Sequence, residues 1–256
     1  SIVFVMGLFN NNPKNFIKKF FRIFFIKIFM KTLTNIVFLS AGEYKYVKNN
    51  FPQYKNKIHF LPFSIDQKFW TFENSYNSYK TNKNVLFIGN DGKRDYEFVI
   101  ELASKMPNNN FTFITKQIKI DQIKSKNVTL LNGKWDDSNI TDLDIKNYYQ
   151  NSSISIIPIF KSLQPSGQSV ALQSLSMGIP VLITKSEGFW EPSLFTDNKH
   201  IIFVEKNKVD LWKNKIEDIL SNSEKYNLIS SEGKKLVTKN NNLETFSEKL
   251  LEIISS

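Results

Sequence analysis

Short apolar runs alternate along the chain with longer stretches in which apolar residues recur at helical spacing. The short runs are rich in Val, Ile and Phe, which is typical of strands buried on both faces of a parallel sheet. They occupy residues 2–6, 35–40, 57–61, 84–89, 111–115, 128–131, 154–159, 181–184 and 201–204. Helical patterns occupy residues 14–31, 43–50, 94–106, 142–151, 208–221, 223–238 and 243–254, with one more short helix before Gly178. This alternation predicts an α/β protein built on doubly wound parallel sheets.

A polar, aromatic connector at residues 67–83 divides this pattern into two units. Residues 84–238 contain enough strands and helices for a complete Rossmann-like domain. Residues 1–66 begin inside an apolar run, and we expect them to be the C-terminal part of a second, incomplete Rossmann-like domain. The final segment, 239–256, is expected to form a helix that packs back on the first unit.

The composition of the 256 residues narrows the chemistry that the chain can carry. Cysteine is absent, which excludes disulfides, thiolate metal sites and a cysteine nucleophile. The two histidines, His59 and His200, lie far apart without ligand-like neighbours, so no metal site is expected. Charge is unevenly distributed, because residues 1–60 contain ten Lys or Arg and a single acid, Glu43, in a chain of net charge +10.

The basic segment 14–31, KNFIKKFFRIFFIKIFMK, is amphipathic when drawn as a helix. Its basic residues up to Arg22 fall opposite an apolar face. That face consists of Phe16, Ile17, Phe20, Ile23 and Phe24. Two structures fit this pattern: a domain helix packed on the sheet with its lysines directed outward, or a basic aromatic helix lying on an anionic membrane surface. A nucleic-acid partner is not expected because no recognition motif accompanies the charge, and no apolar run reaches the roughly 18 residues of a membrane-spanning helix.

Three loops are expected to meet where a ligand would bind, outside the carboxyl ends of the parallel strands. They are residues 89–95 (GNDGKRD), 132–137 (NGKWDD) and 163–169 (LQPSGQS). The third loop leads into the short helix, whose first turn has free N–H groups that can hold a phosphate. The first loop adds Lys93 and Arg94, and a guanidinium can bind a diphosphate through two hydrogen bonds.

The order of these motifs resembles the C-terminal half of a GT-B glycosyltransferase, and is most similar to the retaining enzymes of glycosyltransferase family 4. The similarity extends over about residues 35–256 and is most specific in 164–191. The segments that carry it are the connector Pro62–Asp66 with Phe69 and Trp70 after it, FIGNDGKRDY at 87–96, SMGIPV at 176–181, and Glu191. The resemblance implies a GT-B fold in which residues 1–66 belong to the acceptor-side domain and residues 84–238 bind a nucleotide sugar.

The same resemblance implies roles for individual residues. Arg94, with Lys93 beside it, would neutralise the leaving phosphate and so be the catalytic cation. The backbone amides at the start of the short helix would hold the donor diphosphate, and residues 133–135 would line the nucleobase pocket through backbone groups. The residues expected to bind the donor are Gly89, Asn90, Gly133, Lys134, Trp135, Ser166, Gly167, Gln168, Ser169 and Gln173.

One departure from the family pattern concerns two glutamates that family members place eight positions apart around the third loop. Aligned on SMGIPV, those positions hold Pro165 and Gln173. Gln173 can still bond ribose hydroxyls, since its amide both donates and accepts, whereas Pro165 cannot replace a carboxylate. Either the sugar is recognised differently, through Gln164, Ser166 or Lys161, or the enzyme is impaired.

The implied function is retaining transfer of a hexosyl group from a nucleotide-diphosphate sugar to a glycan or lipid-linked acceptor, with no metal or other cofactor. Catalysis would rest on positioning and electrostatic stabilisation of the departing diphosphate. The alternatives are a non-catalytic nucleotide-sugar-binding relative and a GT-B sugar-nucleotide epimerase, which would need more acid/base residues in the cleft. The expected location is cytoplasmic, with a peripheral position at the inner face of the membrane as an alternative.

Overall fold

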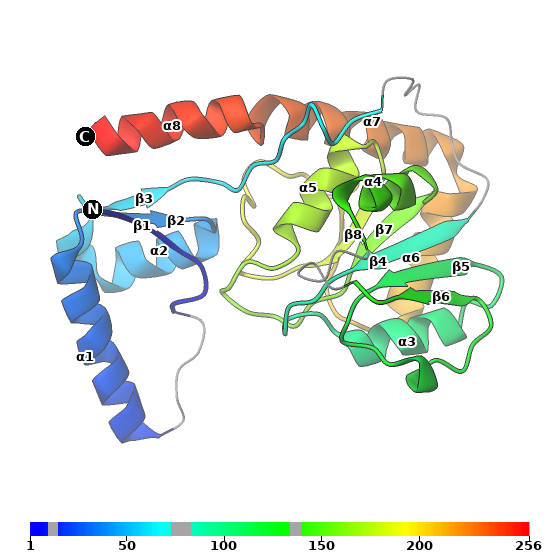
Figure 1. Ribbon diagram of the computed structural model, residues 1–256, viewed down its shortest axis with the longest axis horizontal. Helices are drawn as coiled ribbons and strands as arrows, with labels where there is room; N and C mark the ends of the chain where they lie inside the picture. The colour runs from blue at the N-terminus through cyan, green and yellow to red at the C-terminus, as the bar shows by residue number, and fades with distance from the viewer. Residues whose placement is uncertain (10–14, 73–82, 134–139, 256) are drawn as a thin grey trace.

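The computed structural model describes residues 1–9, 15–72, 83–133 and 140–255, and these form two units, each built on a parallel sheet (Figure 1). The smaller sheet has three strands in the order β1-β2-β3, and the larger has six in the order β6-β5-β4-β7-β8-β9. Every strand pair in both sheets is parallel. The predicted α/β fold class is therefore confirmed.

The smaller unit packs two helices against its three strands. Its elements are β1 (Ile2–Val5), α1 (Phe16–Thr32), β2 (Asn35–Phe38), α2 (Ala41–Asn50), the 3₁₀ turn Pro52–Tyr54 and β3 (Ile58–Phe60). The core of this unit centres on Phe38, Val47 and Met30, all nearly inaccessible to solvent. Ser40 caps α2, because its side chain accepts a hydrogen bond from the backbone N–H of Glu43.

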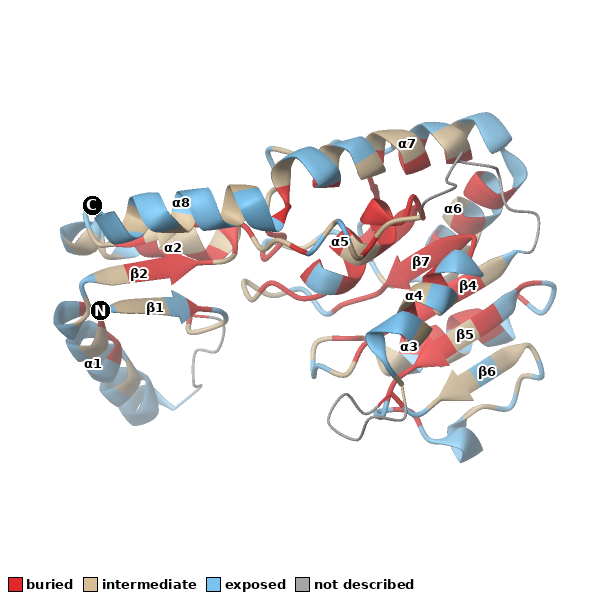
Figure 2. Cartoon of the chain, turned by 45° about the horizontal axis from the view of Figure 1, so that its top comes forward, coloured by how far each residue is buried: buried red, intermediate tan, exposed pale blue. Residues whose placement is uncertain are grey.

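The larger sheet consists of β4 (Asn84–Ile88), β5 (Asn110–Ile114), β6 (Val128–Leu131), β7 (Ile154–Ile157), β8 (Val181–Thr184) and β9 (Ile202–Val204). Its helices are α3 (Tyr96–Ser104), α4 (Asp142–Gln150), α5 (Gln168–Ser176), α6 (Val209–Ser221) and α7 (Ser223–Asn240), with a 3₁₀ turn at Ile120–Gln122. Successive strand residues point to opposite faces, so Leu86 joins the core beneath α4 and α5 while Phe87 joins the core beneath α3 and α6. Both faces are covered, which explains the uninterrupted apolar runs (Figure 2).

The chain passes between the two units twice, after β3 and after α7, and these two segments lie side by side. The backbone N–H of Ile65 donates to the carbonyl of Asn241 at 3.0 Å, and the side chain of Asn241 donates to the carbonyl of Phe63. Beyond this crossing, α8 (Leu243–Ser255) runs along the smaller unit (Figure 1), where the ring of Phe246 stacks on Phe4 with centroids 6.3 Å apart. The first and last parts of the chain thus lie together.

The strands and helices begin and end within about two residues of their predicted limits, and the two 3₁₀ turns were not predicted. The expected boundary at residue 239 falls in the last turn of α7.

The expectation that the apolar face of α1 packs on the sheet is wrong. If α1 were a domain helix with its apolar face on the sheet, Phe16, Phe20 and Phe24 would be covered, yet they are 81%, 61% and 51% exposed. Within α1 the buried residues are Ile26 and Met30, which join the core of the smaller unit, so the helix packs on this unit through other residues than expected.

Candidate functional site

The candidate site lies where the order of the larger sheet reverses, between β4 and β7, at the carboxyl ends of both strands. The loop that follows β7 leads into α5 through Gly167, the N-cap residue of that helix. Gly167 has a φ of 82°, and a Cβ there would lie 2.5 Å from Cγ2 of Ile157. Only glycine meets both conditions without strain, so this residue sets the direction in which the first turn of α5 points.

Arg94 is the central residue of the site and is only 3% exposed. Its Nη1 donates to Oδ2 of Asp91 at 2.9 Å and to Oγ of Ser166, so it joins the loop after β4 to the loop after β7. A Cβ at Gly89 would lie 2.7 Å from Nε of Arg94, and a Cβ at Gly167 would lie 3.6 Å from both of its Nη atoms. Gly89 therefore leaves space that the Arg94 side chain fills, while Gly167 lies in van der Waals contact with the guanidinium.

The electrostatic balance around Arg94 is tight. Burial lowers the pKa of its guanidinium, and the Asp91 carboxylate is the main group that opposes this shift. Nε of Arg94 is buried and has no hydrogen-bond partner among the residues that the structure describes. Burial likewise raises the pKa of the nearby Tyr96 hydroxyl to about 12 and raises that of Tyr149. Both phenols therefore stay neutral and leave Asp91 to balance the cation.

Asn90 joins the first two loops rather than facing an open space. Its side-chain amide donates to the carbonyl of Gly133, and its Oδ1 accepts from the backbone N–H of Lys116 at 2.8 Å. Gly133 is buried, and a Cβ there would lie 2.9 Å from Cγ2 of Ile114. The expected binding residues Lys134 and Trp135 lie outside the described residues.

The expected binding residues of α5 have three different environments. The backbone N–H groups of its first turn have no acceptor within the helix, as in any helix. The side chain of Gln168 is buried and donates to the carbonyl of Leu39 in the smaller unit, whereas Ser169 is exposed. Gln173 lies deeper along the helix, where its Oε1 accepts from the hydroxyl of Tyr149 at 3.2 Å.

Lys93 contacts the cluster through its backbone. Its backbone N–H donates to Oδ1 of Asp91 at 3.0 Å, and its carbonyl accepts from the N–H of Phe160. The structure therefore brings together Gly89, Arg94, Ser166 and Gly167 of the expected set, and adds Asp91, which sequence reasoning missed. The signal was present, because Asp91 lies in the same glycine-containing loop as the two cations.

The smaller unit borders this site. Leu39 and the start of α2 meet the loops after β7 and β8, where the N–H of Ala41 donates to the carbonyl of Trp190 at 2.9 Å. A Cβ at Gly42 would lie 2.0 Å from the carbonyl oxygen of Glu187. The backbones of the two units are therefore in direct contact at this point.

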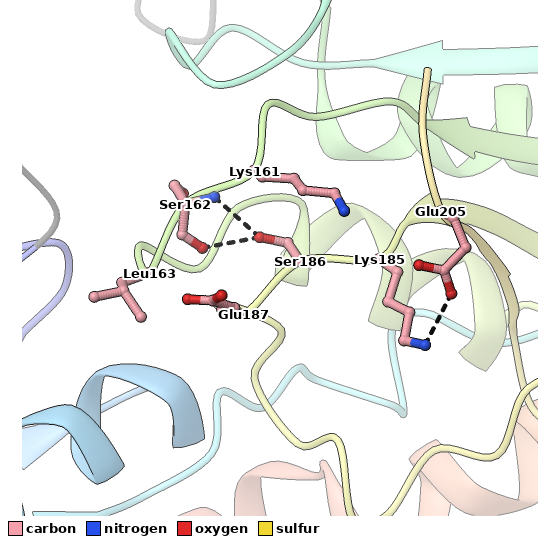
Figure 3. Close-up of a pocket in the computed structure, with 7 residues that line it drawn as sticks. All are labelled: Lys161, Ser162, Leu163, Lys185, Ser186, Glu187 and Glu205. Atoms are coloured by element: carbon pink, nitrogen blue, oxygen red, sulfur yellow. Dashed lines mark hydrogen bonds and ion pairs between the residues drawn. The ribbon is translucent and has the colours of Figure 1, made fainter. Parts of the chain in front are cut away.

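A hollow of about 580 Å³ opens beside the contact, at the carboxyl ends of β7, β8 and β9 (Figure 3). It is lined by Lys161, Ser162, Leu163, Lys185, Ser186, Glu187 and Glu205. Lys185 pairs with Glu205 at 2.8 Å across the hollow. Ser186 accepts from the N–H of Ser162 and donates to its carbonyl, which ties the two loops together. The hollow offers ammonium, hydroxyl and carboxylate groups to a polar ligand.

The comparison with known families identifies the chain. The sequence profile of the glycosyl transferases group 1 matches residues 68–236, more than half of the chain. The chain belongs to this family. A comparison with curated protein sequences gave no match.

Several solved structures have the same fold as this chain. HepE of Anabaena, in complex with UDP and glucose, is similar with a TM-score of 0.74 at 13% identity, over 100% of this chain and 71% of HepE. S. aureus TarM gives 0.73 at 15% identity over 100% of this chain and 50% of TarM. Sucrose-phosphate synthase of Thermosynechococcus elongatus is similar with a TM-score of 0.73 at 13% identity, over 95% of this chain and 63% of the synthase. The chain thus spans about half of TarM and less than two thirds of the synthase, and has the GT-B fold.

Two further observations concern metals and membranes. Within the described residues, no group of three or more His, Asp or Glu side chains is arranged to hold a metal ion. None of the helices in that part of the chain combines the length and apolar character needed to cross a bilayer.

Proposed function

We propose that this group 1 family member transfers a hexosyl group from a nucleotide-diphosphate sugar to a glycan or lipid-linked acceptor of the cell envelope, with retention of configuration as in family 4. The observation that carries the proposal is the buried guanidinium of Arg94 beside Gly167, at the start of α5 and at the point where the strand order reverses. A cation and the amino end of a helix together suit a diphosphate.

The proposed chemistry needs little beyond positioning. As the bond between the anomeric carbon and the diphosphate oxygen breaks, the electron pair leaves with the diphosphate, and the sugar becomes oxocarbenium-like. The acceptor hydroxyl oxygen bonds to the anomeric carbon on the same face, and its proton passes to the departing diphosphate. Arg94 and the first N–H groups of α5 would stabilise the negative charge that accumulates on the diphosphate. In this proposal Lys93 assists as a second cation, and no metal ion takes part.

Sugar recognition in this proposal uses the hollow beside Lys161. Pro165 offers no carboxylate, whereas Ser162, Ser186 and Glu187 line a space close to the loop that precedes α5. Gln173 would bond the ribose, with Tyr149 holding its amide in place. Hydroxyl and carboxylate groups of this kind suit the hydroxyls of a sugar.

Calorimetric titration with UDP-, GDP- and ADP-sugars tests the donor site directly. We expect one of them to bind, and Arg94→Met to weaken its binding by about tenfold or more, equivalent to about 1.4 kcal/mol. Lys119→Met, which removes an exposed cation elsewhere, is the matched control and should bind like the wild type. If no nucleotide sugar binds the folded wild-type chain, the proposal is wrong.

The non-catalytic alternative is favoured by one observation, the proline at position 165 where a carboxylate is expected. Both functions predict binding of a nucleotide sugar, and they differ in turnover. Release of nucleoside diphosphate by the full-length protein, in the presence of its acceptor, supports transfer. Tight binding with no release supports a binding module.

A peripheral position on a membrane is part of the proposal, and α1 supports it. The helix exposes Phe16, Ile17, Phe20, Phe21, Ile23, Phe24, Phe25 and Ile28 (Figure 2). Exposed lysines accompany this face, namely Lys18, Lys27 and Lys31, and α1 contains no acidic residue. On its other side, Arg22 donates to the carbonyl of Leu8 and so is held against the protein. Aromatic residues with lysines around them suit the interface of an anionic bilayer.

Co-sedimentation with phosphatidylcholine vesicles, with and without phosphatidylglycerol, tests this position. We expect binding that increases with the anionic lipid and is lost in a Phe20→Ser, Phe24→Ser double variant. Phe160→Ser is the matched control, because Phe160 is 53% exposed on the larger unit. Equal vesicle binding by the double variant contradicts the proposal. The proposal is also contradicted if the wild type does not bind vesicles and instead forms a dimer that is lost in the double variant.

A further inference from the structure

The carboxylate of Asp91 occupies the position between the two groups that would receive a phosphate. Its Oδ2 accepts from Nη1 of Arg94 at 2.9 Å and from Oγ of Ser166 at 2.8 Å, and its Oδ1 accepts from the N–H of Lys93. Three donors from two loops thus converge on one small anion. This is the hydrogen-bonding pattern that a phosphate oxygen would receive at the same place.

A guanidinium that is 3% exposed needs an anion close to it, since an unpaired buried charge is strongly destabilising. Among the described residues, Asp91 is the acid that forms an ion pair with Arg94. A diphosphate bound at this guanidinium would bring two or more negative charges within hydrogen-bond distance of the same Nη1. It cannot share the site with an ionised carboxylate at low cost, because like charges at this separation repel.

We propose that Asp91 is an internal stand-in for the donor phosphate, which must displace it from Arg94 and Ser166 in order to bind. The inference rests on the proposed function of the site. Asp91 thereby sets the donor affinity: it keeps Arg94 paired while the site is empty, and it opposes every diphosphate that enters. Asp91 also makes the site selective for diphosphates, because an anion with a single charge gains little binding energy by replacing the carboxylate.

The geometry of the loop allows this exchange. The side chain of Asp91 is 43% exposed, so it can turn toward solvent without crossing the core. A Cβ at Gly92 would meet no atom of the described residues within 4 Å, so these residues do not crowd the loop beside Asp91. The backbone of Asp91 is held in place, because its carbonyl accepts from the hydroxyl of Tyr96 at 2.5 Å. Rotation of this one side chain would release Nη1 of Arg94 and Oγ of Ser166.

The test is calorimetric titration of the full chain with inorganic pyrophosphate. Asp91→Asn keeps the shape of the side chain and an oxygen that can accept from Arg94, but removes the competing charge. We expect it to bind pyrophosphate about tenfold more tightly than the wild type. Asp121→Asn, which removes the charge of an exposed aspartate in the 3₁₀ turn Ile120–Gln122, should bind like the wild type.

A second measurement uses the wild-type protein and so does not depend on the folding of the variant. If pyrophosphate displaces Asp91, the N–H of Lys93 loses its acceptor and its hydrogen exchange becomes faster, while exchange at the start of α5 becomes slower. Slower exchange at both places would mean that Asp91 stays where it is, which overturns the inference.

The outcomes separate this inference from the proposal on which it rests. If the wild type and Asp91→Asn bind pyrophosphate equally well, or the variant binds more weakly, the donor site stands and Asp91 is not a stand-in. If neither folded protein binds pyrophosphate or a nucleotide sugar, the donor site itself is wrong. Tighter binding by Asp91→Asn alone supports the inference.

Discussion

The side chain of Gln168, in the first turn of α5, donates a hydrogen bond to the carbonyl oxygen of Leu39 at 2.8 Å. Leu39 immediately follows β2, so this bond ties the helix of the candidate phosphate site to the sheet of the other unit. The two units therefore influence the site together, since a change in their relative position moves the start of α5.

This bond leads to a prediction about stability. Gln168→Leu keeps the size of the side chain but leaves the carbonyl of Leu39 without its partner, which should cost about 1–2 kcal/mol of unfolding free energy. Urea denaturation followed by circular dichroism measures the loss. Ser169→Ala, on the exposed adjacent position, should leave the midpoint unchanged. Equal midpoints for Gln168→Leu and the wild type would show that this contact does not join the units in solution.

Two glycines in the site region make a matched pair of substitutions. Gly167→Ala puts a Cβ at a φ of 82° and 2.5 Å from Ile157, whereas Gly92→Ala puts one into open space. We expect the first to lower the unfolding free energy by about 1–2 kcal/mol or more, and the second to change it little. Thermal unfolding of both variants checks this. Similar melting temperatures would contradict the conformation of the loop before α5.

The Asn90 side chain is predicted to hold the first two loops together. Asn90→Ala removes a donor to the carbonyl of Gly133 and an acceptor for the N–H of Lys116, at a cost of about 2 kcal/mol. Hydrogen exchange should become faster at Lys116, where the amide loses its partner. Asn108→Ala, at an exposed position before β5, is the control. Unchanged exchange at Lys116 in Asn90→Ala would contradict the assigned role.

Glu191 gives a prediction about pH. Burial raises the pKa of its carboxyl above the ordinary 4.5, and the hydrogen bond from Asn241 only partly opposes this. The native state therefore binds a proton more readily than the unfolded chain, so this group destabilises the protein at neutral pH. The penalty begins to shrink as the pH falls through the folded-state pKa and is gone below the unfolded-state pKa.

Glu191→Gln keeps an acceptor for Asn241 and cannot ionise. We expect the variant to be more stable than the wild type at neutral pH, and the difference to shrink as the pH falls toward 4.5. Urea midpoints measured across this range provide the test. A difference that grows on acidification would reverse the sign and contradict the assignment.

The sequence by itself determined the strands, the helices and the edge of the sheet at which the loops meet. The strands are short apolar runs such as 84–88, and the helices repeat their apolar residues at helical spacing, so these features depend on neighbouring residues. The meeting of the loops after β4 and β7 followed from the predicted parallel arrangement, because parallel strands end at one edge of the sheet.

Tertiary structure alone decided which groups face one another. A helical wheel shows that α1 has two faces, but only its packing shows that Arg22 turns toward Leu8 while Phe20 and Phe24 remain exposed. In the same way, Asp91 and Ser166 are 75 residues apart, and nothing local links them. Their contact exists because two strands bring their loops together around a buried cation that needs an anion.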